Sequence, residues 1–300
     1  MMRIAHISDL HAFELKGAAL WQFLGKRSLG LLNMWRKRAA GHPLHILDAL
    51  CRDLNRVSVD HIVATGDLTN LSLPSELARA RKALDSLRLG PREISVIPGN
   101  HDVYAWDAYL RRSFETHLAP YCAGDDLPSE PPHFPYVRVR GPVAIIGCST
   151  ALPSPPPLAD GWLGTPQLKA IGQALDAQKG RFRILLIHHP PLPQSLDLLR
   201  ALRDRRALQK ILRKLGCELI LHGHEHRDVR SALPGPTGDI PVIGVGSATY
   251  SDPRPDRAAR YNIYTVIENG PARFEFRVEQ RVYSPAQGEF AQGAAPQHGT

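Results

Sequence analysis

Five short aliphatic runs in this sequence end in residues of the types that bind metal ions or transfer protons. Each run resembles a buried β-strand, and Asp, Asn or His side chains follow it within a few positions. Together these residues are Asp9 and His11, Asp67, Asn100, His101 and Asp102, His188 and His189, and His222, His224 and His226. In open α/β sheets, ligands gather outside the carboxyl ends of the strands. We therefore expect the five endings to converge on one site.

The mixture of side chains indicates which ions would suit such a site. Carboxylate and imidazole together bind borderline ions such as Mn, Fe, Zn or Co, whereas oxygen-only sites favour Ca or Mg. The candidate groups outnumber the ligands that one ion needs. Two ions roughly 3.5–4 Å apart, sharing a carboxylate, would use them and would suit in-line displacement at phosphorus. The sequence therefore predicts a two-metal phosphoryl-transfer centre.

Each motif taken singly also has a purely structural explanation. Asp-x-His and Gly-Asp are common at turns and helix starts, and proline after histidine can simply end a strand. The cluster at 222–226 is more specific, because alternate positions in an extended segment point the same way. Seven of the fourteen histidines follow these runs. This conjunction favours a metal site over scattered surface residues.

The segments between the runs predict how the site is positioned. Strands and helices alternate, which is typical of a layered α/β domain. The predicted strands cover residues 3–8, 61–65, 93–98, 143–148, 183–187 and 218–222. The predicted helices cover residues 44–57, 75–87, 165–178 and 204–215. Three extended segments beyond residue 240 predict an antiparallel end to the sheets, and a Gly-, Ala- and Pro-rich composition predicts a disordered tail at 284–300.

Charge and cysteine content limit the class of protein. The formal net charge of +8 suits anionic partners such as phosphates, nucleic acid or acidic lipid headgroups. The four cysteines form no CxxC pair, so neither a disulfide framework nor a thiolate zinc site is indicated. No signal peptide and no apolar run of about 18 residues is evident. We expect a cytoplasmic protein whose membrane contact, if it has one, is peripheral at the inner membrane face.

In their order, the motif blocks resemble the signature of the calcineurin-like metallophosphoesterase superfamily. They are DLH at 9–11, GDLTN at 66–70, GNHD at 99–102, HHPP at 188–191 and GHEH at 223–226. The HHPP block and the stretch 161–175 are most similar to class III cyclic-nucleotide phosphodiesterases and glycerophosphodiesterases. The resemblance implies one domain over residues 1–283, a four-layer α-β-β-α sandwich of two mixed sheets with metals at one rim.

The resemblance also implies roles for individual residues. Two divalent ions, Mn, Fe or Zn, would be bridged by Asp67 and by a hydroxide that attacks phosphorus, while His101 stabilises the transition state or protonates the leaving oxygen. Many relatives carry an acid at the position of Asn70, where it orients the catalytic histidine; an amide can still hydrogen-bond, but it cannot stabilise an imidazolium by charge. The implied ligands are Asp9, His11 and His226 for one ion, and Asn100, His188 and His224 for the other. His189, His222 and Asp102 are expected to support these ligands or to face the substrate.

Residues 13–40 form an insert that a plain strand-to-helix connection does not need. Six basic residues stand against one acidic residue within 13–38, and Trp21, Leu24, Leu31 and Trp35 recur near one helical face. We expect a basic amphipathic helical hairpin. It would either pack on the domain as a lid with its charges in water, or touch membrane or an acyl chain and steer anionic substrate to the metals.

The predicted function is metal-dependent hydrolysis of a phosphodiester, of cyclic-nucleotide or glycerophosphodiester type. A membrane-associated pyrophosphatase acting on UDP-diacylglucosamine is an alternative, because such relatives place hydrophobic, basic inserts beside the same metal core. A nuclease is a third reading, but the aromatic content of 7% and the lack of a second basic groove argue against nucleic acid as a partner. A non-catalytic binding relative would usually have lost ligands, whereas this sequence keeps each one.

Overall fold

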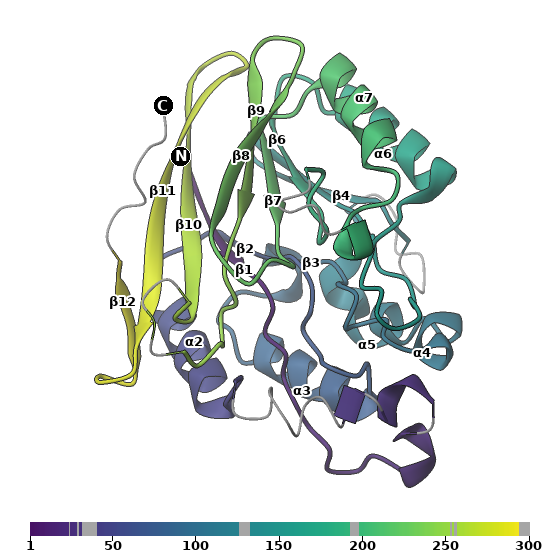
Figure 1. The fold of residues 1–300 in the computed structure, drawn as a ribbon. Coiled ribbons are helices and arrows are strands. Elements are labelled where there is room, and N and C mark those ends of the chain that lie inside the picture. Colours follow the sequence, from purple (N-terminus) through teal and green to yellow (C-terminus); the bar gives the residue numbers. More distant parts are fainter. Residues whose placement is uncertain are drawn as a thin grey trace.

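Two facing β-sheets with helices on their outer sides make up the described part of the protein (Figure 1). The computed structural model describes residues 1–23, 25–28, 30–31, 41–125, 133–192, 198–252, 254 and 257–293. Within these ranges each sheet has six strands and contains both parallel and antiparallel pairs. The predicted four-layer sandwich of two mixed sheets is therefore confirmed.

The first sheet takes its parallel strands from the N-terminal third of the chain. Its strand order is β12 (Glu289–Gln292), β11 (Arg273–Ser284), β10 (Arg260–Gly270), β1 (Met2–Ile7), β2 (His61–Ala64) and β3 (Ile94–Val96). β1, β2 and β3 run parallel, and β10 pairs antiparallel with β1. The three predicted strands at this end of the sequence are confirmed, and their carboxyl ends lie at the same rim because they are parallel.

The second sheet is built around four parallel strands. Its strand order is β4 (Tyr136–Arg140), β5 (Val143–Gly147), β6 (Phe182–Leu186), β7 (Leu219–His222), β9 (Asp239–Gly244) and β8 (Val229–Pro234). The prediction of an antiparallel end beyond residue 240 is wrong for β9, which pairs parallel with β7. The antiparallel partner of β9 is β8, which precedes it in the chain and which the sequence analysis did not predict.

Helices cover both outer faces, as the alternating pattern predicts. α2 (Leu44–Arg56), α3 (Pro74–Asp85) and α5 (Ser113–Cys122) bury apolar side chains in the same core as the first sheet. α6 (Gly164–Ala177) and α7 (Arg205–Leu215) pack on the second sheet, where Leu208 and Leu212 of α7 are fully buried. α4 (Trp106–Leu110) and α5 were not predicted. α4 is one turn long, and α5 contains Pro120 and a kink at Leu118, which hide the helical period.

The ordered sheet extends past the boundary predicted at residue 284. Strand β12 pairs antiparallel with β11, with Phe290 opposite Tyr283. The Phe290 side chain is buried in the core of the first sheet, so the predicted tail is wrong for residues 289–292. A local composition rich in Gly, Ala and Gln concealed a short edge strand that is stabilised by its neighbour. Residues 294–300 lie outside the described residues.

The insert predicted at 13–40 is described only in part. Residues 20–23 form a short 3-10 helix, η1 (Leu20–Phe23), and residues 26–28 and 30–31 are helical. Arg27 is 4% exposed, and its guanidinium donates to Leu71 O at 2.8 Å and to Asp107 Oδ2 at 2.9 Å. The expectation that the charges of a lid lie in water is thus wrong for Arg27, which anchors the insert to the domain. Leu24 and residues 32–40, with Trp35, Arg36, Lys37 and Arg38, lie outside the described residues.

The described helices include no candidate for a membrane-spanning segment. None of them, in the ranges that the structure covers, combines the length and the apolar character that a bilayer crossing needs.

Candidate metal centre

Loops from both sheets bring the predicted ligands together at one rim of the sandwich. The loops after β1 and β2 are hydrogen-bonded along their lengths: Asp9 N donates to Gly66 O at 3.0 Å, and His11 N donates to Asp67 O at 3.0 Å. The loop after β7 joins them from the second sheet, because His224 N donates to Asp9 Oδ2 at 3.3 Å. Segments distant in sequence therefore share one set of hydrogen bonds beneath the site.

The outer subsite, as we call it, consists of Asp9, His11 and His226. His226 Nε2 lies 3.3 Å from Asp9 Oδ1 and 3.3 Å from His11 Nε2. His11 Nε2 lies 3.9 Å from Asp67 Oδ2. The His226 side chain is 32% exposed, so this subsite opens to solvent. The structure thus brings together the three residues that the family resemblance assigns to one metal.

The inner subsite, as we call it, consists of Asn100, His188 and His224, and it is almost completely buried. Asn100 Oδ1 lies 3.2 Å from His188 Nε2 and 3.1 Å from His224 Nδ1. His188 Nε2 is also 3.5 Å from Asp67 Oδ2. The same oxygen of Asp67 therefore faces both subsites, which is the arrangement that a bridging carboxylate requires.

The donor chemistry fits a pair of divalent cations. Asp9 Oδ1 is buried and makes no hydrogen bond within the described part of the chain. The facing nitrogens of His11 and His226 would repel as two lone pairs at 3.3 Å unless a proton or cation lies with them. Burial raises the pKa of Asp9, and the negative charge of Asp67 adds to that rise. Both effects favour the protonated carboxyl, so the ionised form would need a cation beside it. An oxygen and imidazole set of this kind suits Mn, Fe or Zn.

One hydrogen bond sets the tautomer of the most buried ligand. His188 Nδ1 donates to the carbonyl of Thr65 at 2.7 Å, so in the neutral ring the lone pair is on Nε2, the nitrogen that faces Asp67. Burial alone would lower the pKa of His188, but the carboxylates of Asp67 and Asp9 raise it to about 9. Burial would likewise raise the pKa of Asp67, yet positive charge on His188 and His101 holds it well below its usual range.

Backbone strain is concentrated at these ligands. Of the eight non-glycine residues with positive φ among the described residues, five are predicted ligands, namely Asp9, His11, Asp67, His224 and His226. Such conformations cost energy and persist where the surroundings enforce them, commonly at functional sites. A glycine next to the ligands is equally constrained, because a Cβ on Gly99 would lie 2.2 Å from Asp67 Oδ1, far inside contact distance.

The strain also corrects the expectation for the histidine cluster. β7 ends at His222, and the φ values of 71° at His224 and 52° at His226 turn the chain out of the extended form. The three imidazoles therefore do not point the same way: His224 belongs to the inner subsite and His226 to the outer one. His222 is fully buried, with Nδ1 2.9 Å from Gly223 O, and it does not face the substrate side.

Comparison with known proteins identifies the family. The model of the calcineurin-like phosphoesterases matches residues 2–228, which span all five motif blocks. The protein belongs to this family. It is 30% identical over 249 residues to a cAMP/cGMP dual specificity phosphodiesterase of Mycobacterium tuberculosis, covering 72% of this chain and 71% of the relative. It is 26% identical over 270 residues to a glycerophosphodiester phosphodiesterase of Enterobacter lignolyticus, covering 85% of this chain and 84% of the relative.

Solved structures agree on the fold. A dimetal phosphatase from Danio rerio aligns with a TM-score of 0.58 at 14% identity, covering 92% of this chain and 98% of the other. A purple acid phosphatase from yellow lupin aligns with the same TM-score and identity over 97% of this chain and 52% of the other. At such identity the likeness concerns the fold alone. The protein is a phosphoric ester hydrolase of the metallophosphoesterase type.

His101 of this phosphoesterase lies where a catalytic histidine is expected, but a different group orients it. His101 Nδ1 donates to the main-chain carbonyl of Asn70 at 2.7 Å, and the His101 amide donates to Asp67 Oδ1 at 2.8 Å. The Asn70 side chain instead donates through Nδ2 to His11 O at 2.7 Å. The expected side-chain role of Asn70 is thus replaced by its carbonyl. That carbonyl is available whether an acid or an amide occupies position 70.

Asp102 and His189 of the phosphoesterase are buried supports. Asp102 accepts hydrogen bonds from the amides of Leu68, Thr69 and Gly99 and from the Thr69 hydroxyl, which ties together the loops after β2 and β3. His189 is fully buried, with Nδ1 2.7 Å from Thr150 Oγ1 and Nε2 3.2 Å from Ala159 O. Neither side chain faces the substrate side, contrary to one of the two roles expected for them.

A cleft with a cation on each side runs over the centre. Two adjoining pockets share Asn100 and His101; Lys26 lines one of them and Arg200 lines the other. The Lys26 ammonium lies 4.1 Å from the ring centroid of Tyr104, which itself stacks on His101. Burial lowers the pKa of Lys26 to about 8. The insert therefore forms one wall of the cleft.

The sequence analysis missed several residues at this site. Tyr104 lies two residues after the GNHD block but is not of a metal-binding type, and Arg200 lies in the short helix η3 (Leu198–Arg200) after the HHPP block. His42 also lies beside the outer subsite, although it precedes a helix rather than follows a strand. In the sequence, His42 lies between the basic insert and the next helix, and a histidine at such a position is too common to indicate a site.

Proposed function

We propose that this phosphoesterase hydrolyses small phosphodiesters, of the cyclic-nucleotide or glycerophosphodiester type. The observation that carries the proposal is the position of Asp67, whose Oδ2 faces His11 at 3.9 Å and His188 at 3.5 Å beside the cleft that His101 lines. The two relatives named as phosphodiesterases, at modest identity, support the choice of diesters over monoesters.

The predicted ligands fall into two sets, each of which would hold one ion. Asp9, His11 and His226 would hold one ion, and Asn100, His188 and His224 would hold the other, with Asp67 shared. When bound, such ions lower the pKa of a water molecule and offset charge on the phosphoryl oxygens. The Thr65 carbonyl accepts a bond from the His188 ring and the Asp67 carboxylate accepts one from the His101 amide, which limits reorganisation during the reaction.

His101 is placed to act on the leaving oxygen. Because Nδ1–H is donated to Asn70 O, the protonated imidazole presents its second proton on Nε2, and the residue lines both pockets of the cleft. Tyr104 stacks against the ring at 5.6 Å and limits its rotation. His101 would donate the Nε2 proton to the departing alkoxide or, as imidazolium, stabilise its charge.

Lys26 and Arg200 would bind the charged or polar groups of the substrate on either side of phosphorus. Arg200 Nη2 donates to His224 O at 3.0 Å, so the guanidinium is fixed beside the inner subsite. Lys26 is held over Tyr104 at the other end. A diester has a substituent on each side of its phosphorus, which matches a cleft with a cation at each end.

A substrate screen tests the proposal. The purified protein with added Mn²⁺ is offered 3′,5′-cyclic nucleotides, glycerophosphodiesters, a nucleotide-lipid pyrophosphate and single-stranded DNA, and phosphate or monoester release is measured. We expect kcat/KM for a cyclic nucleotide or a glycerophosphodiester to exceed that for the other two classes by at least about tenfold. Preference for the pyrophosphate or for DNA would contradict the proposed substrate class.

A second candidate, action on a lipid-linked pyrophosphate, is favoured by exposed apolar side chains on the segments that flank Lys26. Leu20 is 89% exposed and Trp21 59% exposed in the insert, and Trp106 and Leu110 are 64% and 74% exposed on α4. Arg27 joins the two segments, because it binds Gln22 O and Asp107 Oδ2. Exposed tryptophan and leucine next to a basic segment are typical of peripheral membrane contact.

Liposome binding distinguishes this candidate. Deleting residues 13–40 would remove the buried Arg27, so point variants are the better probe. We expect Trp21→Glu to reduce cosedimentation with anionic liposomes at low salt, whereas Trp162→Glu, at another exposed tryptophan, leaves it unchanged. No binding of the unaltered protein to anionic liposomes would count against membrane contact.

A further inference from the structure

Both ends of the cleft over the metal centre carry a positive charge that is held in position. Arg27, the neighbour of Lys26, is buried and bonded to the domain, and the Lys26 ammonium lies over the Tyr104 ring at 4.1 Å from its centroid. At the other end, the Arg200 guanidinium donates to His224 O at 3.0 Å. Burial lowers the pKa of Lys26 to about 8, so its ammonium is still charged at pH 7. A substituent that extends from phosphorus in either direction therefore meets a cation.

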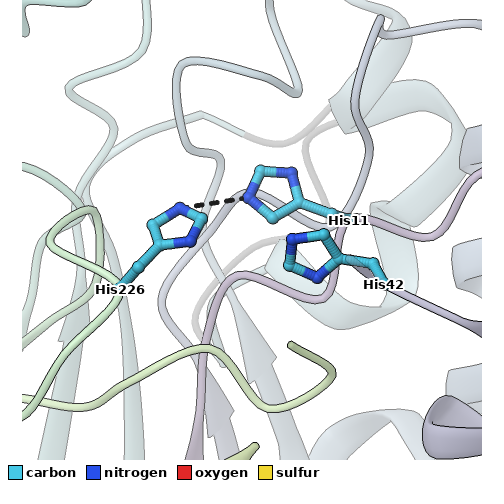
Figure 2. Close-up of side chains that lie close together, drawn as sticks. All are labelled: His11, His42 and His226. Atoms are coloured by element: carbon cyan, nitrogen blue, oxygen red, sulfur yellow. Dashed lines mark hydrogen bonds between the residues drawn. The ribbon is translucent and has the colours of Figure 1, made fainter. Parts of the chain in front are cut away.

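The pocket over the predicted ligands has one acidic residue among its described members, which is Asp67. Oδ2 of Asp67 lies 3.9 Å from His11 Nε2 and 3.5 Å from His188 Nε2, so it belongs to the metal centre. Figure 2 shows the ring of His226, another member of this pocket, next to the rings of His11 and His42. An imidazole carries no negative charge with which to attract a substrate ammonium group.

The pocket that Lys26 lines has no acidic residue among its described members. Asp160 is the acid whose negative charge offsets part of the effect of burial on the Lys26 pKa. Its carboxylate is buried and accepts hydrogen bonds from the Ser154 hydroxyl and the Arg203 guanidinium. Asp160 is therefore not available to pair with a substrate cation.

The aromatic lining of the cleft does not suit a substrate cation either. Proteins bind quaternary ammonium groups on the faces of Trp, Tyr or Phe rings. Among the described residues that line the two pockets, Tyr104 is the one residue of these types. Its ring already has the Lys26 ammonium over it and stacks on His101. A choline group would compete with Lys26 for this ring and would be repelled by its charge.

We propose that the cleft selects against phosphodiesters with a cationic substituent, such as choline or ethanolamine, and accepts neutral or anionic substituents, such as a nucleoside or glycerol. The inference rests on the proposed function and narrows it, because it divides the glycerophosphodiesters by the charge of their second alcohol. Like charges a few ångströms apart at a partly exposed site change an affinity by about tenfold. The half-buried Lys26 should contribute more than Arg200, whose exposed charge is screened by water.

A matched pair of chromogenic diesters isolates the effect of charge. In p-nitrophenyl phosphorylcholine and p-nitrophenyl 3,3-dimethylbutyl phosphate, the leaving group and the shape are the same, and a charged nitrogen in one replaces a carbon in the other. With added Mn²⁺ at pH 7 and low salt, we expect kcat/KM for the neutral ester to exceed that for the choline ester by about tenfold or more. The neutral substituent is also more apolar, and that contribution remains in each variant. The change in the ratio when a cation is removed therefore measures the charge effect.

Single variants assign the selectivity to residues. Lys26→Met keeps an unbranched side chain without the charge and should reduce the ratio by about five- to tenfold, whereas Arg200→Met should reduce it by about two- to threefold. The matched controls are Lys16→Met and Arg206→Met, because these two side chains are exposed and line neither pocket. The controls should leave the ratio within about 1.5-fold of the unaltered protein. Both substrates are assayed on one preparation, so a loss of folded enzyme cancels in the ratio.

Equilibrium binding provides the same comparison without turnover. Calorimetric titration of the Mn²⁺-loaded protein with phosphocholine and with 3,3-dimethylbutyl phosphate gives two dissociation constants. We expect the neutral monoester to bind more tightly by about tenfold, and we expect Lys26→Met to reduce that difference.

The outcomes separate this inference from the proposed function. Equal or better use of the choline ester by the unaltered protein, or a ratio that neither Lys26→Met nor Arg200→Met changes, would overturn the charge selection even if diester hydrolysis is confirmed. If no diester is hydrolysed, the proposed function fails and the binding of the two monoesters decides the inference. A preference for the neutral monoester that depends on Lys26 then upholds it, and equal binding or no binding overturns it.

Discussion

The two metal subsites each have an additional histidine, and the two histidines differ in their hydrogen bonds. At the inner subsite, the His189 ring is 4.3 Å from that of His224, but both of its nitrogens are bonded, to Thr150 and to Ala159. Burial lowers the pKa of His189 to about 3, so it is neutral. At the outer subsite, the His42 ring is 4.6 Å from that of His11, and its Nδ1 is bonded to Thr249 Oγ1. The comparison teaches that closeness to a subsite does not by itself make a histidine a ligand, because hydrogen bonds hold both rings to the domain.

The largest effect is expected where the two subsites meet. Asp67→Ala removes the carboxylate that faces both, so both ions should be lost and kcat for bis(p-nitrophenyl) phosphate should fall by about a thousandfold or more. Metal analysis and initial rates with added Mn²⁺ measure this. Asp48→Ala, at an exposed carboxylate on α2, is the control. Full activity in Asp67→Ala would refute the shared site.

Removing one ligand from each subsite should give unequal losses. His224→Ala opens a buried position with no substitute, and we expect a loss of about a hundredfold or more that high Mn²⁺ does not reverse. His226→Ala should be rescued to within about tenfold by millimolar Mn²⁺, because the His226 side chain is 32% exposed and water can take its place at the outer subsite. Initial rates across a Mn²⁺ titration give both results. Equal rescue of the two variants would remove the difference between the subsites.

Replacing the inner additional histidine should affect stability rather than metal binding. His189→Leu leaves Thr150 Oγ1 and Ala159 O without their partner, which costs about 1–3 kcal/mol of unfolding free energy. The two metal dissociation constants should stay within about threefold of the unaltered protein. Urea unfolding of the metal-free protein and chelator competition test the two parts. A large loss of metal affinity in His189→Leu would place this residue among the ligands after all.

The cations at the two ends of the cleft should differ in their pH dependence. Burial lowers the pKa of Lys26 to about 8, so its charge is present below that pH and is lost above it. KM for an anionic diester should therefore rise by several-fold, up to about tenfold, between pH 7 and pH 9. Lys26→Arg should remove that rise, because guanidinium keeps its charge, while the exposed Lys16→Arg should not. An identical profile in Lys26→Arg would exclude Lys26 as its origin.

The five motif blocks were predictable because their information is local. An aliphatic run followed within a few residues by Asp, Asn or His predicts both a buried strand and a ligand at its end, and parallel strands present those ends at one rim. Asp9, Asp67, Asn100 and His188 follow this rule, and the structure brings them together. The helices between the strands were predictable for the same reason, since α7 repeats Leu208 and Leu212 at helical spacing.

Tertiary structure alone decided which groups surround those ligands. His42 reaches the outer subsite because α2 and Thr249 hold it there, and no spacing in the sequence relates it to His11 or His226. In the same way, the bond that orients His101 comes from the carbonyl of Asn70, a group that every residue has. The pairing of donors and acceptors depends on how segments far apart in the chain pack. The order of residue types along the chain does not specify that packing.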